Sequence, residues 1–225
     1  MIVQSLYDMY TTKPALVLTR QPRQIGDITL DSLESYDGRD PGRPILLAIR
    51  GRVYDVTEGR EYYGPRGGYH VFAGRECSQA LGKMTVDEAD CNDDLKDLNE
   101  KQLKTLHDWE VKLQEKYTVV GKVVPPQKLT EQQLAAFSGA DSSKPMYLAI
   151  KDLIFDVSTG TDFYGPDGVY PFAGRQCARA FAMNSTELTD CTDNLADLSR
   201  MELQNLQDWE AKFYFKYPII GHLVS

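Results

Sequence analysis

The side chains that could do chemistry gather in two glycine-rich stretches of the chain. The first, "REYYGPRGGYHVFAGREC", begins at residue 60, and the second, "TDFYGPDGVYPFAGRQC", begins at residue 161. Each has one tyrosine before a Gly-Pro pair and another just before a Phe-Ala-Gly-Arg run: Tyr63 and Tyr69, then Tyr164 and Tyr170. A phenol donates and accepts hydrogen bonds, and neighbouring glycines let a flat molecule approach the backbone closely. The repeated tyrosines are therefore the first candidates for a binding site.

Each stretch ends at a cysteine that has a second cysteine fourteen residues further on, giving the pairs Cys77 with Cys91 and Cys177 with Cys191. The chain has no Cys-x-x-Cys motif, which disfavours a zinc site or a thioredoxin-like redox motif. Two interpretations stay open. The pairs are intradomain disulfides of an oxidising compartment such as the mitochondrial intermembrane space, or they are buried thiols of a reducing one.

The three histidines do not support a chemistry shared by both stretches. Pro171 and Gln207 stand where the first half has His70 and His107, and His222 has no histidine partner in the first half. The glycine-rich stretches also lack a nucleophile with its base, a nucleotide-binding loop and paired carboxylates, so we expect no enzyme activity.

An internal duplication organises the whole chain. "LAI" at residues 47–49 recurs at 148–150, an offset of 101, and "DWE" at 108–110 recurs at 208–210, an offset of 100. One residue is missing from the second copy, where "YHVF" becomes "YPF". The repetition predicts an N-terminal arm over residues 1–26, a domain over 27–124, a stiff linker at 125–127 with two prolines, and a second domain over 128–225.

Both copies predict the same elements. A short capped helix comes first, then a strand pair over 45–56 or 146–157, then a helix that starts after Gly74 or Gly174. A long amphipathic helix and a short closing strand follow. The apolar face of this long helix is expected to lie in the core. It consists of Leu103, Leu106, Trp109 and Leu113 in one copy, and of Leu203, Leu206, Trp209 and Phe213 in the other. The class is α+β, a small mixed sheet with helices packed on one side.

Composition narrows the range of partners. The net charge of −8 argues against nonspecific binding to nucleic acid and against charge-driven binding to anionic lipid. No stretch approaches the ~20 apolar residues that span a bilayer. The first residues lack the features of a secretory signal, which leaves a docking arm or a weak mitochondrial address as interpretations.

The motifs together resemble a known family. "YDVTEGREYYGPRGGYHVFAGREC" with "LHDWEVKLQEKYTVVGKV", and "FDVSTGTDFYGPDGVYPFAGRQC" with "LQDWEAKFYFKYPIIGHL", are similar to membrane-associated progesterone receptor (MAPR) domains, a branch of the cytochrome b5-like heme/steroid-binding domains. The resemblance covers nearly all of the chain after about residue 26. It implies two tandem cytochrome b5-like domains. The His-Pro-Gly-Gly signature of cytochrome b5 itself is missing, which argues against an electron carrier with paired histidine ligands.

The resemblance also implies a heme b pocket whose iron is held by a tyrosine phenolate. Position by position, the iron ligands fall on Tyr69 and Tyr170. Supporting polar contacts fall on six further residues: Tyr63, Lys116, Tyr117, Tyr164, Lys216 and Tyr217. A phenolate favours ferric iron and lowers its reduction potential. We expect heme above all in the first copy, because Pro171 restricts the backbone of Tyr170; His70 is an alternative ligand there.

Two functions follow as expectations. The first is a protein that binds heme, or a sterol-like apolar molecule, in heme handling or as a partner of heme enzymes such as cytochromes P450. The alternative is a heme-free accessory subunit of a large intracellular or mitochondrial assembly. Family members usually carry an N-terminal membrane helix that this sequence lacks, so the expected location is intracellular, either mitochondrial or peripheral on endomembranes.

Overall fold

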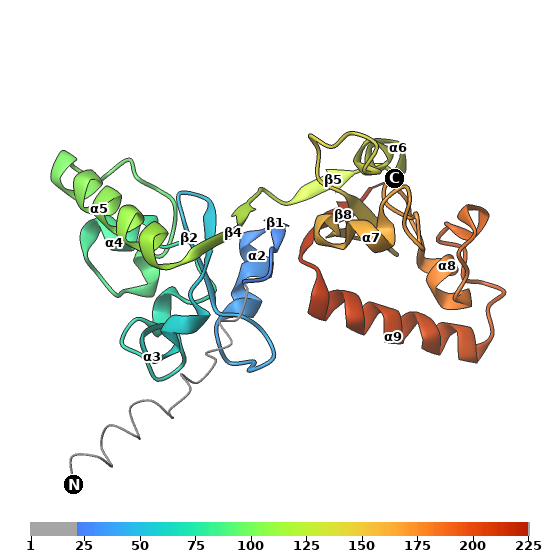
Figure 1. The fold of residues 1–225 in the computed structure, drawn as a ribbon, viewed down its shortest axis with the longest axis horizontal. Coiled ribbons are helices and arrows are strands. Elements are labelled where there is room, and N and C mark those ends of the chain that lie inside the picture. The colour runs from blue at the N-terminus through green and yellow to red at the C-terminus, as the bar shows by residue number, and fades with distance from the viewer. Residues whose placement is uncertain (1–21, 225) are drawn as a thin grey trace, which may run out of the picture.

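The computed structural model describes residues 22–224 as two units of the same design (Figure 1). Each unit has a four-stranded sheet, in the order β1-β4-β3-β2 for the first and β5-β8-β7-β6 for the second. The two edge strands that open the units run parallel to their neighbours, and the other pairs are antiparallel, so both sheets are mixed. The fold class predicted from the sequence is confirmed. Of the expected arm over residues 1–26, residues 1–21, with the possible mitochondrial address, lie outside the described residues.

The first unit runs from β1 to β4. Its strands are β1 (Gly26–Ile28), β2 (Leu46–Ile49), β3 (Arg52–Asp55) and β4 (Thr118–Val123). Its helices are α2 (Leu30–Leu33), α3 (Arg60–Tyr63), α4 (Ser78–Lys83) and α5 (Glu100–Lys116), with single 3-10 turns at Glu34–Tyr36, Thr57–Gly59, His70–Phe72 and Glu88–Asp90.

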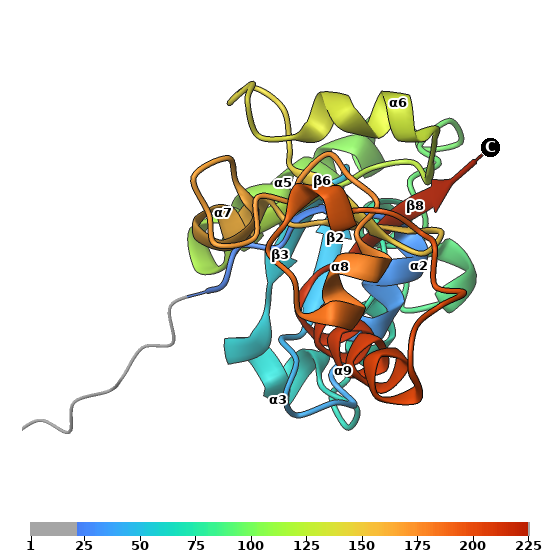
Figure 2. The same ribbon diagram turned by 90° about the vertical axis from the view of Figure 1, so that its right-hand side faces the viewer.

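The second unit runs from β5 to β8. Its strands are β5 (Gln127–Leu129), β6 (Tyr147–Ile150), β7 (Leu153–Asp156) and β8 (Ile219–Leu223). Its helices are α6 (Glu131–Leu134), α7 (Thr161–Tyr164), α8 (Ala178–Met183) and α9 (Arg200–Lys216), with 3-10 turns at Ala135–Phe137, Ser158–Gly160 and Leu188–Asp190. Figure 2 looks onto α8 and α9 of this unit.

Alternation along the strands gives each sheet two apolar faces. In β2, Leu47 and Ile49 point into the cluster that α4 and α5 cover, whereas Leu46 and Ala48 point to the opposite cluster with Leu33 of α2. The longer helices thus lie on one side of the sheet, as expected, and single-turn helix α2 closes the other side. The second unit repeats this arrangement.

Capping side chains fix where the long helices begin. Asn99 and Gln102 form a capping box at the start of α5, and Ser199 and Glu202 form one at the start of α9. Both predicted starts are confirmed. The predicted helix after Gly74 begins instead at Ser78, because residues 75–77 first bond along β2: Ala48 donates to the Arg75 carbonyl at 2.8 Å. In the second unit α8 begins correspondingly at Ala178.

Candidate functional site

A tight loop returns Tyr69 to the helix that carries Tyr63. The Tyr69 amide donates to the Tyr62 carbonyl at 2.9 Å. The loop passes so close to that carbonyl at Gly67 that a Cβ atom there would collide with it. The second unit closes the same way, with the Tyr170 amide donating to the Phe163 carbonyl at 2.8 Å. The glycines of the repeated stretch therefore serve to place its second tyrosine.

The loop brings three predicted site residues of the first unit into one aromatic cluster. The ring of Tyr63 lies 6.3 Å from that of Tyr69 and 6.0 Å, edge-on, from that of Tyr117. Tyr69 also stacks on Phe72 at 5.9 Å, and its side chain stays 41% exposed. A ligand could therefore reach the Tyr69 phenol, while Tyr63 and Tyr117 support it from inside.

Lys116 lies at the edge of this cluster. Its Nζ atom is 5.2 Å from the ring centroids of both Tyr62 and Tyr117. Contact with the Tyr117 phenol raises the pKa of Lys116.

The cavity in front of Tyr69 is small and mostly apolar. Its volume is about 110 Å³. Its lining is Leu47, Tyr63, Tyr69, Phe72, Leu81, Met84, Thr85, Val86, Trp109 and Leu113. Ligand pockets usually measure about 300–1,000 Å³, so a macrocycle would lie partly outside, against the exposed side chains of Met84 and Val86. Trp109, predicted to be core, is only half-buried because it forms one wall of this cavity.

The second unit has a larger hollow, of about 520 Å³. All four predicted site residues of this unit line it, together with five others from the same unit: Tyr164, Tyr170, Lys216, Tyr217, Phe163, Trp209, Lys212, Phe213 and Phe215. Arg23, which precedes β1, completes the wall. This volume is within the usual range for a ligand pocket. The sequence had led us to expect the ligand mainly in the first unit, because Pro171 restricts the backbone of Tyr170.

Two substitutions between the units account for the difference between the two hollows. Phe181 stands where the first unit has Leu81, and its ring packs 5.0 Å from Trp209 and 5.4 Å from Phe172. The larger Phe181 ring fills the space that corresponds to the cavity beside Leu81 in the first unit. The Trp209 indole also donates to Asn184 at 2.9 Å, where the first unit has Met84. The second hollow therefore opens toward the end of α9.

Burial raises the pKa of one site tyrosine in each unit. Desolvation, with the neighbouring Tyr117, raises the pKa of Tyr63 well above its ordinary value. Desolvation and the adjacent Tyr217 do the same to the pKa of Tyr164. These two phenols stay neutral and can donate hydrogen bonds. Tyr69 is the exposed phenol of the first unit, and Tyr170 is half-buried in the second.

A buried hydroxyl in the second unit lacks a partner. Tyr217 is 2% exposed, and its Oη atom makes no hydrogen bond within residues 22–224. A buried polar atom without a partner costs free energy and often marks a functional site. Its ring lines the hollow and lies edge-on to Tyr164 at 5.7 Å. The tyrosines, the cationic rim and the apolar walls fit a flat apolar group that carries acceptor atoms.

Two other expectations from the sequence concern His70 as an iron ligand and the cysteine pairs as disulfides. His70 places Nδ1 2.9 Å from the Gly67 carbonyl and lines a different hollow with Glu34, so the structure does not bring it to the cavity of Tyr69. All four cysteines are free thiols, and the Sγ atoms of Cys177 and Cys191 are 3.4 Å apart. Within the described residues no cluster of three or more histidine, cysteine or acidic side chains could hold a metal ion.

The sequence reasoning missed two lysines of the site. Lys112 lies over the ring of Trp109 at 5.1 Å, and Lys212 lies over that of Trp209 at 4.6 Å. Their signal was the repeated spacing in "DWEVK" and "DWEAK". Arg23 was missed as well, and it has no repeated counterpart that could have revealed it.

Comparison with known proteins defines the class. Residues 29–124 match the family described as "Cytochrome b5-like Heme/Steroid binding domain". The chain is 49% identical over 98 residues to "Probable steroid-binding protein 3" of Arabidopsis thaliana, covering 44% of this chain and 98% of that protein. The chain belongs to this cytochrome b5-like family.

Longer relatives are similar over stretches of comparable length. Identity to "Membrane-associated progesterone receptor component 2" of Homo sapiens is 42% over 116 residues, covering 50% of this chain and 51% of that protein. Identity to "Membrane steroid-binding protein 2" of Oryza sativa subsp. japonica is 46% over 103 residues, covering 46% of this chain and 39% of that protein. The chain thus spans about half or less of these relatives. A solved Arabidopsis thaliana structure, described as having a cytochrome b5 like fold, is 46% identical in sequence. The match covers 47% of this chain and 96% of that one, with a TM-score of 0.42. No helix among the described residues is long and apolar enough to cross a membrane.

Proposed function

We propose that the protein binds heme b through tyrosine phenolates, Tyr69 in the first unit and Tyr170 in the second. The observation that carries the proposal is the repeated site: in each unit a half-exposed or half-buried tyrosine stands beside a neutral phenol at an apolar hollow, and two lysines lie over aromatic rings nearby. Bound heme would supply a ferric iron centre of low reduction potential.

The protein groups would divide the work as follows. The phenolate oxygens of Tyr69 and Tyr170 would hold the iron, and the neutral phenols of Tyr63 and Tyr164 would donate hydrogen bonds. The apolar walls would exclude water from one face of the macrocycle. Four lysines could pair with the propionates at the rim: Lys112, Lys116, Lys212 and Lys216.

This site supports a binding role in heme handling, or in support of a heme enzyme, rather than catalysis by the protein itself. The named relatives are steroid-binding proteins and receptor components, which makes a sterol-like molecule the alternative occupant of the same hollows. Relatives named as membrane proteins support a peripheral place on an endomembrane.

A second candidate is the heme-free accessory subunit. The observation that favours it is the 110 Å³ volume of the first cavity, which cannot enclose a macrocycle. On this account the duplicated units serve as a scaffold within a larger assembly, and neither hollow takes a cofactor.

Titration with hemin, followed by the Soret band, decides between the two candidates. Heme binding predicts saturation at one or two equivalents, with one equivalent lost in each of Tyr69→Phe and Tyr170→Phe when both sites fill. Tyr62→Phe is the matched control, because Tyr62 is exposed and does not line the cavity. No saturable band, or equal losses in the control, would leave the scaffold role.

A further inference from the structure

One cation that lines the hollow of the second unit, Arg23, comes from the N-terminal part of the chain. The Nη2 atom of Arg23 donates to the Lys216 carbonyl at 2.6 Å, and its guanidinium carbon lies 5.9 Å from the ring centroid of Tyr217. The segment is anchored two residues later, where buried Ile25 donates to the Val120 carbonyl at 2.7 Å. Arg23 is thus attached to the first unit while it lines the second unit's hollow.

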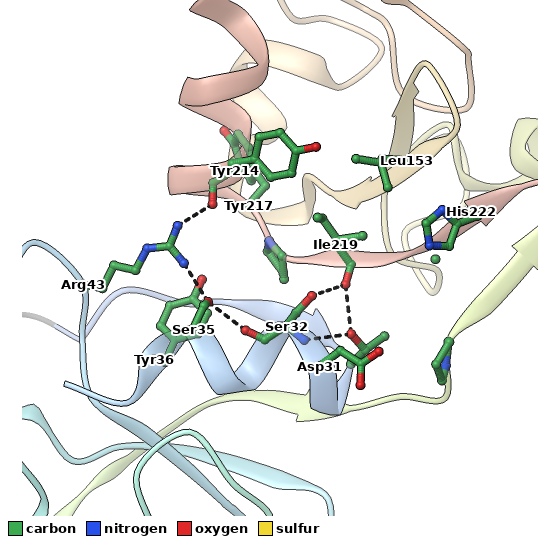
Figure 3. A pocket seen from close by; sticks show the side chains of 14 residues that line it. Asp31, Ser32, Ser35, Tyr36, Arg43, Leu153, Tyr214, Tyr217, Ile219 and His222 are labelled. Atoms are coloured by element: carbon green, nitrogen blue, oxygen red, sulfur yellow. Dashed lines mark hydrogen bonds between the residues drawn. The ribbon is translucent and has the colours of Figure 1, made fainter. Parts of the chain in front are cut away.

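Further contacts hold the end of α9 against the first unit (Figure 3). Arg43 donates to the Tyr214 carbonyl at 2.7 Å, and the Ser32 hydroxyl donates to the Ile219 carbonyl at 2.6 Å. These bonds fix the backbone on either side of Lys216 and Tyr217. The position of Arg23 over the hollow therefore belongs to an ordered contact between the units.

The charges around this hollow are all of one sign. Three cations stand at its rim: Arg23, Lys212 and Lys216. None of the described residues that line it is acidic, although the whole chain carries a net charge of −8. Lys212 and Lys216 lie over aromatic faces, and neither is among the lysines that form ion pairs within residues 22–224. An anionic ligand would find these cations available.

The first unit has the two corresponding lysines, Lys112 and Lys116, but no counterpart of Arg23. By the repeat offset, the position of Arg23 corresponds to Val124, just ahead of β5. Glu115 stands in α5 where α9 has the hollow-lining Phe215. The two hollows thus differ in charge as well as in volume.

We propose that Arg23 makes the hollow of the second unit a site for planar apolar acids, molecules with an aromatic or fused-ring body and a carboxylate or sulfonate at one edge. The aromatic walls stack on the body, and the rim of cations pairs with the acid. The inference rests on the same hollow as the proposed heme site and narrows its ligand class. A tandem chain can build this site, whereas an isolated second unit lacks the arginine.

Two fluorescent probes with the same ring system test this charge requirement in the full-length chain. 8-Anilinonaphthalene-1-sulfonate is an acid, and N-phenyl-1-naphthylamine is its uncharged counterpart. We expect Arg23→Gln to weaken binding of the sulfonate about fivefold, the size of a partly exposed ion pair, and to change binding of the amine less than twofold. Arg23→Lys should keep most of the affinity. Arg39→Gln, at an 85% exposed arginine of the first unit, should change neither probe.

The outcomes separate this inference from heme binding. Equal weakening of both probes by Arg23→Gln, in a variant whose thermal unfolding matches the wild type, would show a packing role and overturn the proposal. No change for either probe would overturn it as well. If the sulfonate responds as expected but hemin gives no tyrosine-dependent Soret band, the planar-acid site stands and the heme proposal falls.

Discussion

The phenol oxygen of Tyr217 lies 2.6 Å from the point that a Cβ atom on residue 160 would occupy, and residue 160 is a glycine. The first unit repeats the relationship, with the Tyr117 hydroxyl against Gly59. Both tyrosines follow a long helix and both glycines end a 3-10 turn, so the approach ties the helix end to the loop that carries the site tyrosines.

Gly160→Ala should therefore push the Tyr217 ring out of its place. Forcing an added methyl into a packed core costs about 1–3 kcal/mol of unfolding free energy, measured by urea denaturation. Adding Tyr217→Phe removes the colliding oxygen and should recover part of the loss. Gly68→Ala is the control, since a Cβ atom there meets nothing within 4 Å. Equal stability of Gly160→Ala and wild type would contradict the steric relationship.

A pair of buried carboxyl groups joins the units and should make stability depend on pH. The Asp27 amide donates to Asp156 Oδ2 at 2.5 Å, and the Tyr147 hydroxyl donates to Asp27 Oδ2 at 2.7 Å. Burial, with the nearby Asp27 charge, raises the pKa of Asp156 to about 6. Lys122 Nζ, 3.4 Å from Asp27 Oδ1, is the cation that faces the pair.

A raised carboxyl pKa means that the folded state holds this proton more tightly than the unfolded chain. Its stabilising contribution is complete below the unfolded pKa near 4 and is lost as pH rises through about 6. We expect the unfolding free energy of the wild type to fall by up to about 3 kcal/mol more than that of Asp156→Asn between these values. Parallel pH profiles for the two proteins would contradict the assignment.

Arg43, like Arg23, donates a hydrogen bond from the first unit to a carbonyl of α9. It donates to Ser35 at 2.6 Å and to the Tyr214 carbonyl at 2.7 Å, and it stacks on Phe215 at 5.6 Å. Arg43→Gln should lower the unfolding free energy by about 1.5–3 kcal/mol, because these are hydrogen bonds of a charged group. The exposed Arg39→Gln variant should lose less than about 0.5 kcal/mol. Similar losses in both variants would show that the contact between the units is weak.

The thiol pairs should react unevenly. Burial raises the pKa of Cys77 and of Cys177, whereas hydrogen bonds from these thiols lower the pKa of the half-buried Cys91 and Cys191. Iodoacetamide under native conditions should therefore modify Cys91 and Cys191 first, as read by peptide mass spectrometry. Labelling that begins at the two buried cysteines would contradict this order.

The features that repeat between the two halves could be predicted from the sequence. The offset of about a hundred residues predicted two equal units, and local patterns were enough to predict the strand pair at 45–56 and the capped long helices. Strands β1 and β5 were missed because three residues are too few to show alternation. β5 also begins at Gln127, the last residue of the predicted linker.

Contacts between distant residues could not be predicted from local patterns. Leu81 and Phe181 both read as apolar helix positions, yet their difference in size decides where each hollow opens. Arg23 reaches Lys216 across 193 positions through the packing of the two units. Such features depend on three-dimensional placement, which neither periodicity nor repeat offsets encode.

The proposed heme site requires a bond between ferric iron and the phenolate oxygens of Tyr69 and Tyr170. Resonance Raman spectroscopy of the hemin complex tests it most directly, because iron-bound phenolate has vibrations of its own. We expect these bands in the wild type and in Tyr62→Phe, and their loss in the double variant Tyr69→Phe with Tyr170→Phe. A hemin complex without phenolate bands, or bands that survive in the double variant, would contradict the account.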